Sequence, residues 1–200
     1  PAPFAVVPGG TGNVPWDFTS SSGMKLFHNS TKAADPKFSG DQKELHNFLT
    51  ILEDREESYS WMDILTIPVG NAGETRSLTK EFGTITEDQI RQHALVYLDL
   101  PERNNQASSC MRKFIMSSLE ADLLNQLLQL KPHYTILTAN NGTQDSGALM
   151  LYHLIKLVSI ETRSTVANIM RQLNNLPKMM EEAKSDIKEF NKNVNQHIAD

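Results

Sequence analysis

Residues 86–130 have the sequence TEDQIRQHALVYLDLPERNNQASSCMRKFIMSSLEADLLNQLLQL, in which apolar side chains recur at helical spacing. Thr86 and Gln89 match a capping box at the start of a first helix, and Pro101 marks its end. Residues 107–118 place small and apolar side chains at i, i+3, i+4, i+7 and i+8. A leucine-rich segment completes the stretch. The sequence therefore predicts three successive amphipathic helices.

Helical patterns also flank this stretch. Either Ser39 or Asp41 caps a helix that we expect to run to about Tyr59. The charged run EDREE at residues 53–57 is interpreted as its solvated outer face, because charges packed this densely stay in water. Further along, Ser146 caps a helix with apolar residues on all sides. This pattern marks it as the most central helix of the fold.

Three shorter segments carry weaker signals. The apolar run at 61–69 is too short to assign to a strand or a helix, and we expect it to be buried. Residues 70–73 are predicted to form a turn because they begin and end with glycine. Residues 138–145 are rich in Asn and Gly and are predicted to be a loop.

Composition agrees with helices rather than sheets, since leucine is abundant and aromatic residues make up 7% of the chain. We expect an all-α multi-helix bundle with an extended arm at 1–22, an N-terminal helical lobe at 23–161, and the whole or the beginning of a smaller C-terminal helical lobe at 162–200. Thr162 to Ser164 is the expected hinge. The inward positions of the helices predict the core: Leu49, Leu52, Ile90, Phe114, Ile115, Leu123, Leu127, Leu154 and Val158.

The overall composition excludes several classes of protein. No apolar run approaches the roughly 20 residues of a membrane span, and we expect no membrane partner. The net charge of -5 is not segregated into blocks, which argues against a dedicated nucleic-acid reader. A single cysteine excludes an internal disulfide and a cysteine-rich zinc site within these residues. A reducing, cytoplasmic location is expected.

The sequence contains no pattern that predicts catalysis. The histidines are scattered, no pair stands at i, i+4 with a carboxylate partner, and no nucleophile elbow is present. Cys110 lies on the apolar stripe at 107–118, which predicts a buried and inert thiol. We therefore expect no enzyme, no metal site and no cofactor. The histidines in question are His28, His46, His93, His133, His153 and His197.

The last part of the chain has a different pattern. An apolar stripe runs from Val166 to Val194 and is interrupted at Pro177, while the remaining positions are rich in Lys, Glu and Asn. Such a stripe is too long to be covered by a chain that ends a few residues later, so it is a candidate interface with another subunit. The candidate assembly residues are Met170, Leu173, Met180, Ile187, Phe190 and Val194.

The stretch KFSGDQKELHNFLTILEDREESYSW has a Phe-x-Gly turn that leads into a helix ending near Trp61. Four later stretches carry helical patterns of small and apolar residues: ITEDQIRQHALVYLD, ASSCMRKFIMSSLEADLLNQLL, ALMLYHLIKLV and IMRQLNNLPKMMEEAKSDIKEFNKNV. Together these stretches, which cover most of the chain from about Phe38 onward, resemble the Gag capsid region of copia-type LTR retrotransposons. Ala107, Ile115 and Leu119 occupy recurring small and apolar positions of that family.

The resemblance implies a capsid-like helical protein that self-assembles, as rings or a shell, into a virus-like particle around the element's RNA. The partner would be the chain itself, with RNA bound indirectly or weakly, in the cytoplasm. The zinc knuckle with which many Gag proteins hold RNA is absent from the sequence, and the retroviral major homology motif is not recognisable around Gly147 to Arg163.

A second hypothesis is a monomeric helical adaptor that binds a partner helix or peptide in an apolar groove. Its site would be the face from Leu119 to Leu130, or the methionine-rich patch of Met170, Met179 and Met180. Self-association separates the two hypotheses, since an assembler forms larger particles as its concentration rises.

Overall fold

The computed structural model describes residues 14–70, 73–100 and 102–159. The chain divides into two compact units, Pro1–Val158 and Ser159–Asp200. The description below concerns the first unit. The predicted lobe boundary between 161 and 162 lies outside the described residues and stays a prediction.

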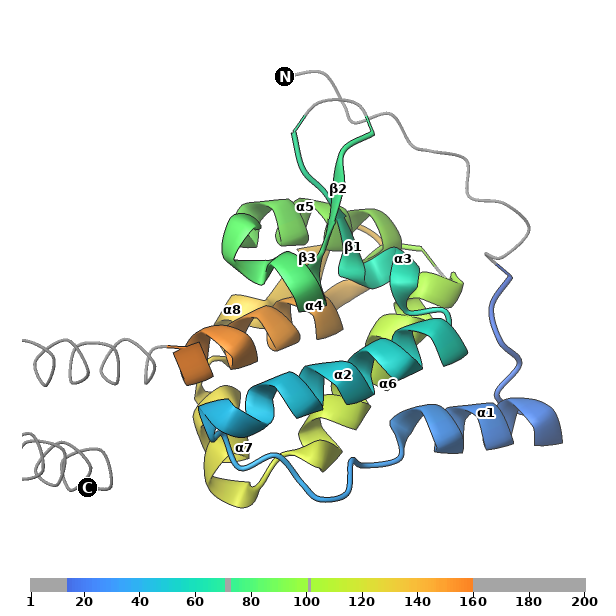
Figure 1. The fold of residues 1–200 in the computed structure, drawn as a ribbon. Coiled ribbons are helices and arrows are strands. Elements are labelled where there is room, and N and C mark those ends of the chain that lie inside the picture. The colour runs from blue at the N-terminus through green and yellow to red at the C-terminus, as the bar shows by residue number, and fades with distance from the viewer. Residues whose placement is uncertain (1–13, 71–72, 101, 160–200) are drawn as a thin grey trace, which may run out of the picture. The chain divides into compact units, whose positions relative to one another are not determined.

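The described unit is mainly helical, as predicted, with short hairpins added (Figure 1). An unlabelled last helix occupies residues 147–159, as far as the structure describes it. The named elements are α1 (Ser21–Thr31), α2 (Gln42–Ser58), α3 (Met62–Leu65), β1 (Thr66–Pro68), β2 (Thr75–Ser77), α4 (Leu78–Glu81), the 3-10 helix η1 (Phe82–Thr84), α5 (Glu87–Leu98), α6 (Arg103–Ser118), α7 (Ala121–Gln129), α8 (Lys131–Tyr134), β3 (Thr135–Thr138) and β4 (Gly142–Asp145).

The predicted helix signals appear at the expected places. Asp41 caps α2 by accepting a hydrogen bond from the backbone N–H of Lys43. Both halves of the predicted capping box at Thr86 and Gln89 are present at the start of α5. The hydroxyl of Ser146 accepts a hydrogen bond from the backbone N–H of Leu149 and so caps the last helix. Local start signals therefore located three helices correctly.

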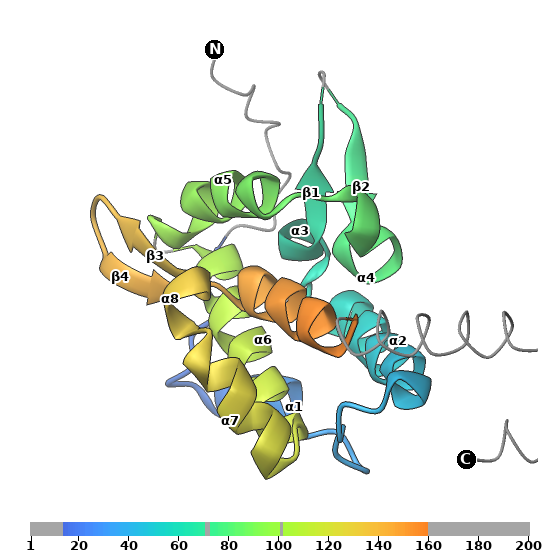
Figure 2. The same cartoon turned by 90° about the vertical axis from the view of Figure 1, so that its left-hand side faces the viewer.

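The last helix and α6 form the centre of the unit. In Figures 1 and 2 the last helix, drawn in orange, lies between α5 above it and α7 below it. Its first residue, Gly147, packs so closely on α6 that an added Cβ would lie 2.7 Å from the backbone oxygen of Ser108. Only glycine permits this crossing. All nine residues expected in the core are buried, with Leu49 the most exposed at 8%.

An aromatic cluster fills the space between α2 and α6. Phe38 stacks on Phe48 with ring centroids 4.9 Å apart, and Phe48 stacks on Phe114 at 6.0 Å. Trp61 packs against the same Phe114 ring at 5.9 Å. The sulfur of Cys110, one turn before Phe114 on α6, is buried as expected, and burial raises the pKa of its thiol.

The outer face predicted for residues 53–57 is wrong at two positions. Arg55 turns toward α1 and donates hydrogen bonds to the carbonyl oxygens of Asn29, Ser30 and Lys32 at 2.8–3.0 Å. Its guanidinium also lies 4.1 Å from the centroid of the Phe114 ring. Glu56 is 8% exposed, and burial raises its pKa. The neighbours that cover these charges are remote in sequence, so the local charge pattern does not reveal them.

The structure contains two hairpins for which the sequence predicted only a turn and a loop. β1 pairs antiparallel with β2 around the predicted turn at 70–73, and β3 pairs antiparallel with β4, which lies inside the predicted loop at 138–145. Strands of three or four residues are too short for an alternating pattern to be recognised. Ile67 and Val69 in the untyped apolar run are buried, as expected.

The end of the predicted arm is docked. Gln106 on α6 accepts a hydrogen bond from the backbone N–H of Trp16 at 2.6 Å and donates one to its carbonyl oxygen at 2.9 Å. The ring of Trp16 also lies beside Phe18, at a centroid distance of 5.9 Å. The helix α1 then begins at Ser21, two residues inside the range given to the arm. In the described residues, no helix is long and apolar enough to span a membrane.

We expect the variant Phe114→Ala to lose about 3–5 kcal/mol of unfolding free energy, because it leaves a cavity between two aromatic rings. Chemical denaturation followed by tryptophan fluorescence measures the loss. Met62→Ala is the matched control, since Met62 is 52% exposed and its truncation should cost less than about 0.5 kcal/mol. A loss below about 1 kcal/mol for Phe114→Ala would contradict the central role of this ring.

Candidate functional site

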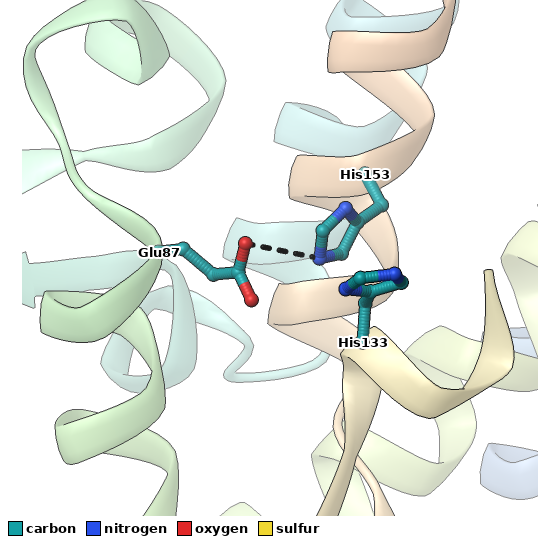
Figure 3. Close-up of side chains that lie close together, drawn as sticks. All are labelled: Glu87, His133 and His153. Atoms are coloured by element: carbon teal, nitrogen blue, oxygen red, sulfur yellow. Dashed lines mark ion pairs between the residues drawn. The ribbon is translucent and has the colours of Figure 1, made fainter.

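Three side chains that can hold a metal ion converge from separate segments of the chain (Figure 3). Glu87 is the first residue of α5, His133 lies in α8, and His153 lies in the helix at 147–159. One ligand atom from each side chain lies within 4.8 Å of the other two. Imidazole nitrogens and a carboxylate oxygen are ligand types that Zn²⁺ takes in proteins. We call this group the Glu–His–His cluster.

Local structure explains how each side chain reaches the cluster. The capping box fixes the start of α5, and Glu87 is stabilised in the first turn by the positive end of the helix dipole. Pro132 occupies the first turn of α8, where its missing N–H has no helical partner to lose. The short helix therefore begins directly after α7 and positions His133 beside the last helix.

His153 is the buried member of the cluster. Its Nε2 atom lies 3.6 Å from Oε2 of Glu87, and the residue is 6% exposed. This nitrogen has no hydrogen-bond partner among the residues that the structure describes. Burial lowers the pKa of His153, and this effect outweighs the opposing attraction of the Glu87 carboxylate. The neutral imidazole is thus favoured, which is the form that binds metals.

Arg91 bonds both other members of the cluster. Its Nη2 atom donates to Oε1 of Glu87 at 2.9 Å and to the backbone oxygen of His133 at 2.6 Å. Burial is the largest single effect on the pKa of Glu87 and raises it. The hydrogen bond from Arg91 and the charges of His153, Arg91 and His133 all lower this pKa, and together they outweigh burial, so the net shift is downward. The carboxylate therefore stays ionised, with Oε1 held by Arg91 and Oε2 turned toward His153.

Sequence analysis did not predict this cluster. Sequence analysis predicted no metal site because no histidine pair stands at i, i+4 with a carboxylate. That rule detects ligands on one helix, whereas Glu87, His133 and His153 are brought together only when α5, α8 and the last helix pack. A local cue did exist at one position, since His153 stands amid the apolar residues of the most central helix, where a polar side chain needs a partner.

A pocket of about 260 Å³ lies between the β1–β2 hairpin and α5. The hairpin projects from the unit beside α5 (Figures 1 and 2). Val96, which is 54% exposed, and His93 form part of the pocket wall. The other lining residues are Pro68, Gly70, Asp88, Gln89 and Gln92. Sequence analysis did not predict this pocket, because β1 and β2 were not recognised as strands.

His93 anchors α5 to the preceding segment. Its Nε2 lies 2.8 Å from the backbone oxygen of Asp63 and therefore donates, because a carbonyl oxygen only accepts. The ring also packs edge-on against Tyr97, with centroids 5.3 Å apart. Burial lowers the pKa of His93, against the smaller opposing effect of the hydrogen bond to Asp63. The protonated form is thus disfavoured in the folded protein.

Of the two predicted interfaces, only the face on α7 lies within the described residues. The assembly residues Met170, Leu173, Met180, Ile187, Phe190 and Val194, and the methionine patch of the adaptor hypothesis, lie outside the described residues. The alternative groove face on α7 is packed inward: Leu123 and Leu127 are buried, whereas Leu128 is 38% exposed.

No family model, curated protein or solved structure matches this chain. What the chain does is therefore inferred from its own residues, as they are arranged in the described unit and patterned along the sequence.

We expect His93 to make stability depend on pH. A histidine with a lowered folded-state pKa stabilises the fold above its ordinary pKa of 6.5, and this contribution is lost as the pH falls from there toward the folded-state value. The variant His93→Gln keeps an N–H donor for Asp63 without titrating. Its unfolding free energy should therefore fall less than that of the wild type between about pH 7.5 and pH 5.5.

Urea denaturation across this pH range measures the effect. His28→Gln is the matched control, because it makes the same substitution at an exposed position on α1. His153 titrates equally in all three proteins and cancels in the comparison. Identical pH profiles for His93→Gln and the wild type would contradict the assignment.

Proposed function

We propose that this chain is a structural Gag capsid protein of the copia-type retrotransposon kind, which self-assembles into a particle around RNA. One observation carries the proposal. The sequence stretches that resemble that family supply α2, α5, α6 and the last helix, and these helices build the buried core of the described unit. A rigid helical unit of this kind is what repeated subunit contacts require.

Weak contacts suffice for such an assembly. In a ring or shell each subunit uses the same interfaces many times, so modest individual affinities add up to a stable particle. The apolar stripe from Val166 to Val194 supplies the candidate contact by its sequence pattern. These apolar positions belong to the second unit. We propose that they contact a neighbouring subunit.

RNA would be enclosed rather than read. The net charge is -5, and basic residues are interspersed with acidic ones along the sequence. In the described unit, Arg112 and Lys131 are both paired with Asp145. Phosphate contacts by the remaining cations would be weak, salt-sensitive and independent of sequence.

The test of assembly uses the double variant Ile187→Asp and Phe190→Asp in the full chain. Light scattering should show wild-type particles growing with protein concentration and salt, and the double variant should remain monomeric. A charge buried in an interface costs several kcal/mol, which exceeds a weak subunit contact. Fluorescence of the buried Trp61 should be unchanged, since the core of the first unit is untouched.

The matched control is the double variant Ser185→Asp and Gln196→Asp. It adds the same charge at positions that a helical period places opposite the stripe, and it should assemble like the wild type. A wild-type chain that stays monomeric at high concentration and salt would favour the adaptor hypothesis. Normal assembly of Ile187→Asp and Phe190→Asp would remove the stripe as the interface.

A further inference from the structure

We propose that Glu87, His133 and His153 bind one divalent transition-metal ion, for which Zn²⁺ is the best match. The ion would join the start of α5, the helix α8 and the last helix, which are distant in sequence (Figure 3). This site lies in the first unit and is independent of the proposed assembly function.

The spacing of the ligand atoms is close to that of a metal site. In a tetrahedral zinc site with bonds of 2.0–2.1 Å, neighbouring ligand atoms lie about 3.4 Å apart. Oε2 of Glu87 and Nε2 of His153 are already 3.6 Å apart. The remaining separations are at most 4.8 Å. His133 is exposed, so rotation of its side chain can close the difference.

The buried nitrogen of His153 is the strongest single indication of a ligand. This atom is buried and turned toward Glu87 (Figure 3). It forms no hydrogen bond with any of the described residues. Buried polar atoms without a partner are rare in folded proteins and call for an explanation such as a bound ion. A metal ion would satisfy this nitrogen directly.

The surroundings contain both a support and an opposing charge. Arg91 holds Oε1 of Glu87, which leaves Oε2 oriented for the metal, as outer-shell partners do in known sites. The positive charge of the same guanidinium repels a cation and reduces the affinity. Three protein ligands would leave a fourth position open for water or another ligand.

The donor set selects the kind of metal. Mg²⁺ and Ca²⁺ prefer sites made of oxygen ligands alone, whereas two imidazoles with one carboxylate suit Zn²⁺ and its neighbours in the transition series. We therefore expect Zn²⁺ to bind with one ion per chain, and excess Mg²⁺ should not displace it.

The experiment measures binding to the full chain with Zn²⁺ in calorimetry and with Co²⁺ as a spectroscopic probe. Co²⁺ in a four-coordinate site gives intense visible absorption bands that a merely structural role of these residues would not produce. His133→Gln and Glu87→Gln should each weaken binding by at least ~100-fold, since each removes a direct ligand rather than an outer-shell partner. Both positions are accessible to solvent, so these variants should fold.

The buried His153→Gln should abolish binding as well, but it is used only if its circular dichroism matches the wild type. His46→Gln is the control, because His46 is exposed on α2 and outside the cluster. The expected result is one bound ion with intense Co²⁺ bands in the wild type and His46→Gln. The proposal is overturned if the wild type lacks these bands, or if His133→Gln and Glu87→Gln bind as tightly as it does. Light scattering measures particle formation in the same samples. Its result tests the assembly function alone and does not depend on whether the metal binds.

Discussion

The ring of Phe114 is the contact on which the packing of the described unit depends. Phe48 from α2 stacks against it, Trp61 packs on its side, and the Arg55 guanidinium lies over its face. The same guanidinium donates hydrogen bonds to the carbonyl oxygens at the end of α1. The Phe114 ring on α6 thus contacts α2 and the segment before α3 directly, and it is linked to α1 through Arg55. Because Arg55 presents a planar fork of donors, it can satisfy several carbonyl oxygens and still cover the ring.

The last helix brings a polar side chain, His153, into this apolar centre. Gly147 lets it approach α6 closely, and its apolar residues are buried on nearly every side. That close packing also carries His153 into the interior beside Glu87, where an imidazole nitrogen is isolated from water. A buried unpaired nitrogen opposes folding unless a ligand or a proton partner satisfies it. The fold therefore combines a strongly packed helix with a buried nitrogen that the proposed ion would satisfy.

Assembly and metal binding are assigned to different parts of the chain. The candidate assembly residues from Met170 to Val194 belong to the second unit, whereas the Glu–His–His cluster lies in the first. A metal ion would stiffen the first unit by joining helices that are distant in sequence. A rigid subunit loses less conformational entropy when it enters a ring or shell, so the two properties are compatible although neither requires the other.

The sequence by itself determined the features that depend on neighbours three or four residues apart. The capping box at Thr86, the cap at Asp41 and the inward stripes of α5 and α6 follow from helical periodicity, which is a local property of the chain. Only the tertiary structure decided the contacts of Arg55 with α1 and Phe114, the burial of Glu56, the two hairpins and the Glu–His–His cluster. Each of these arises from contacts between segments distant in sequence, and a charged or polar residue has the same local pattern whether its partner is water or another helix.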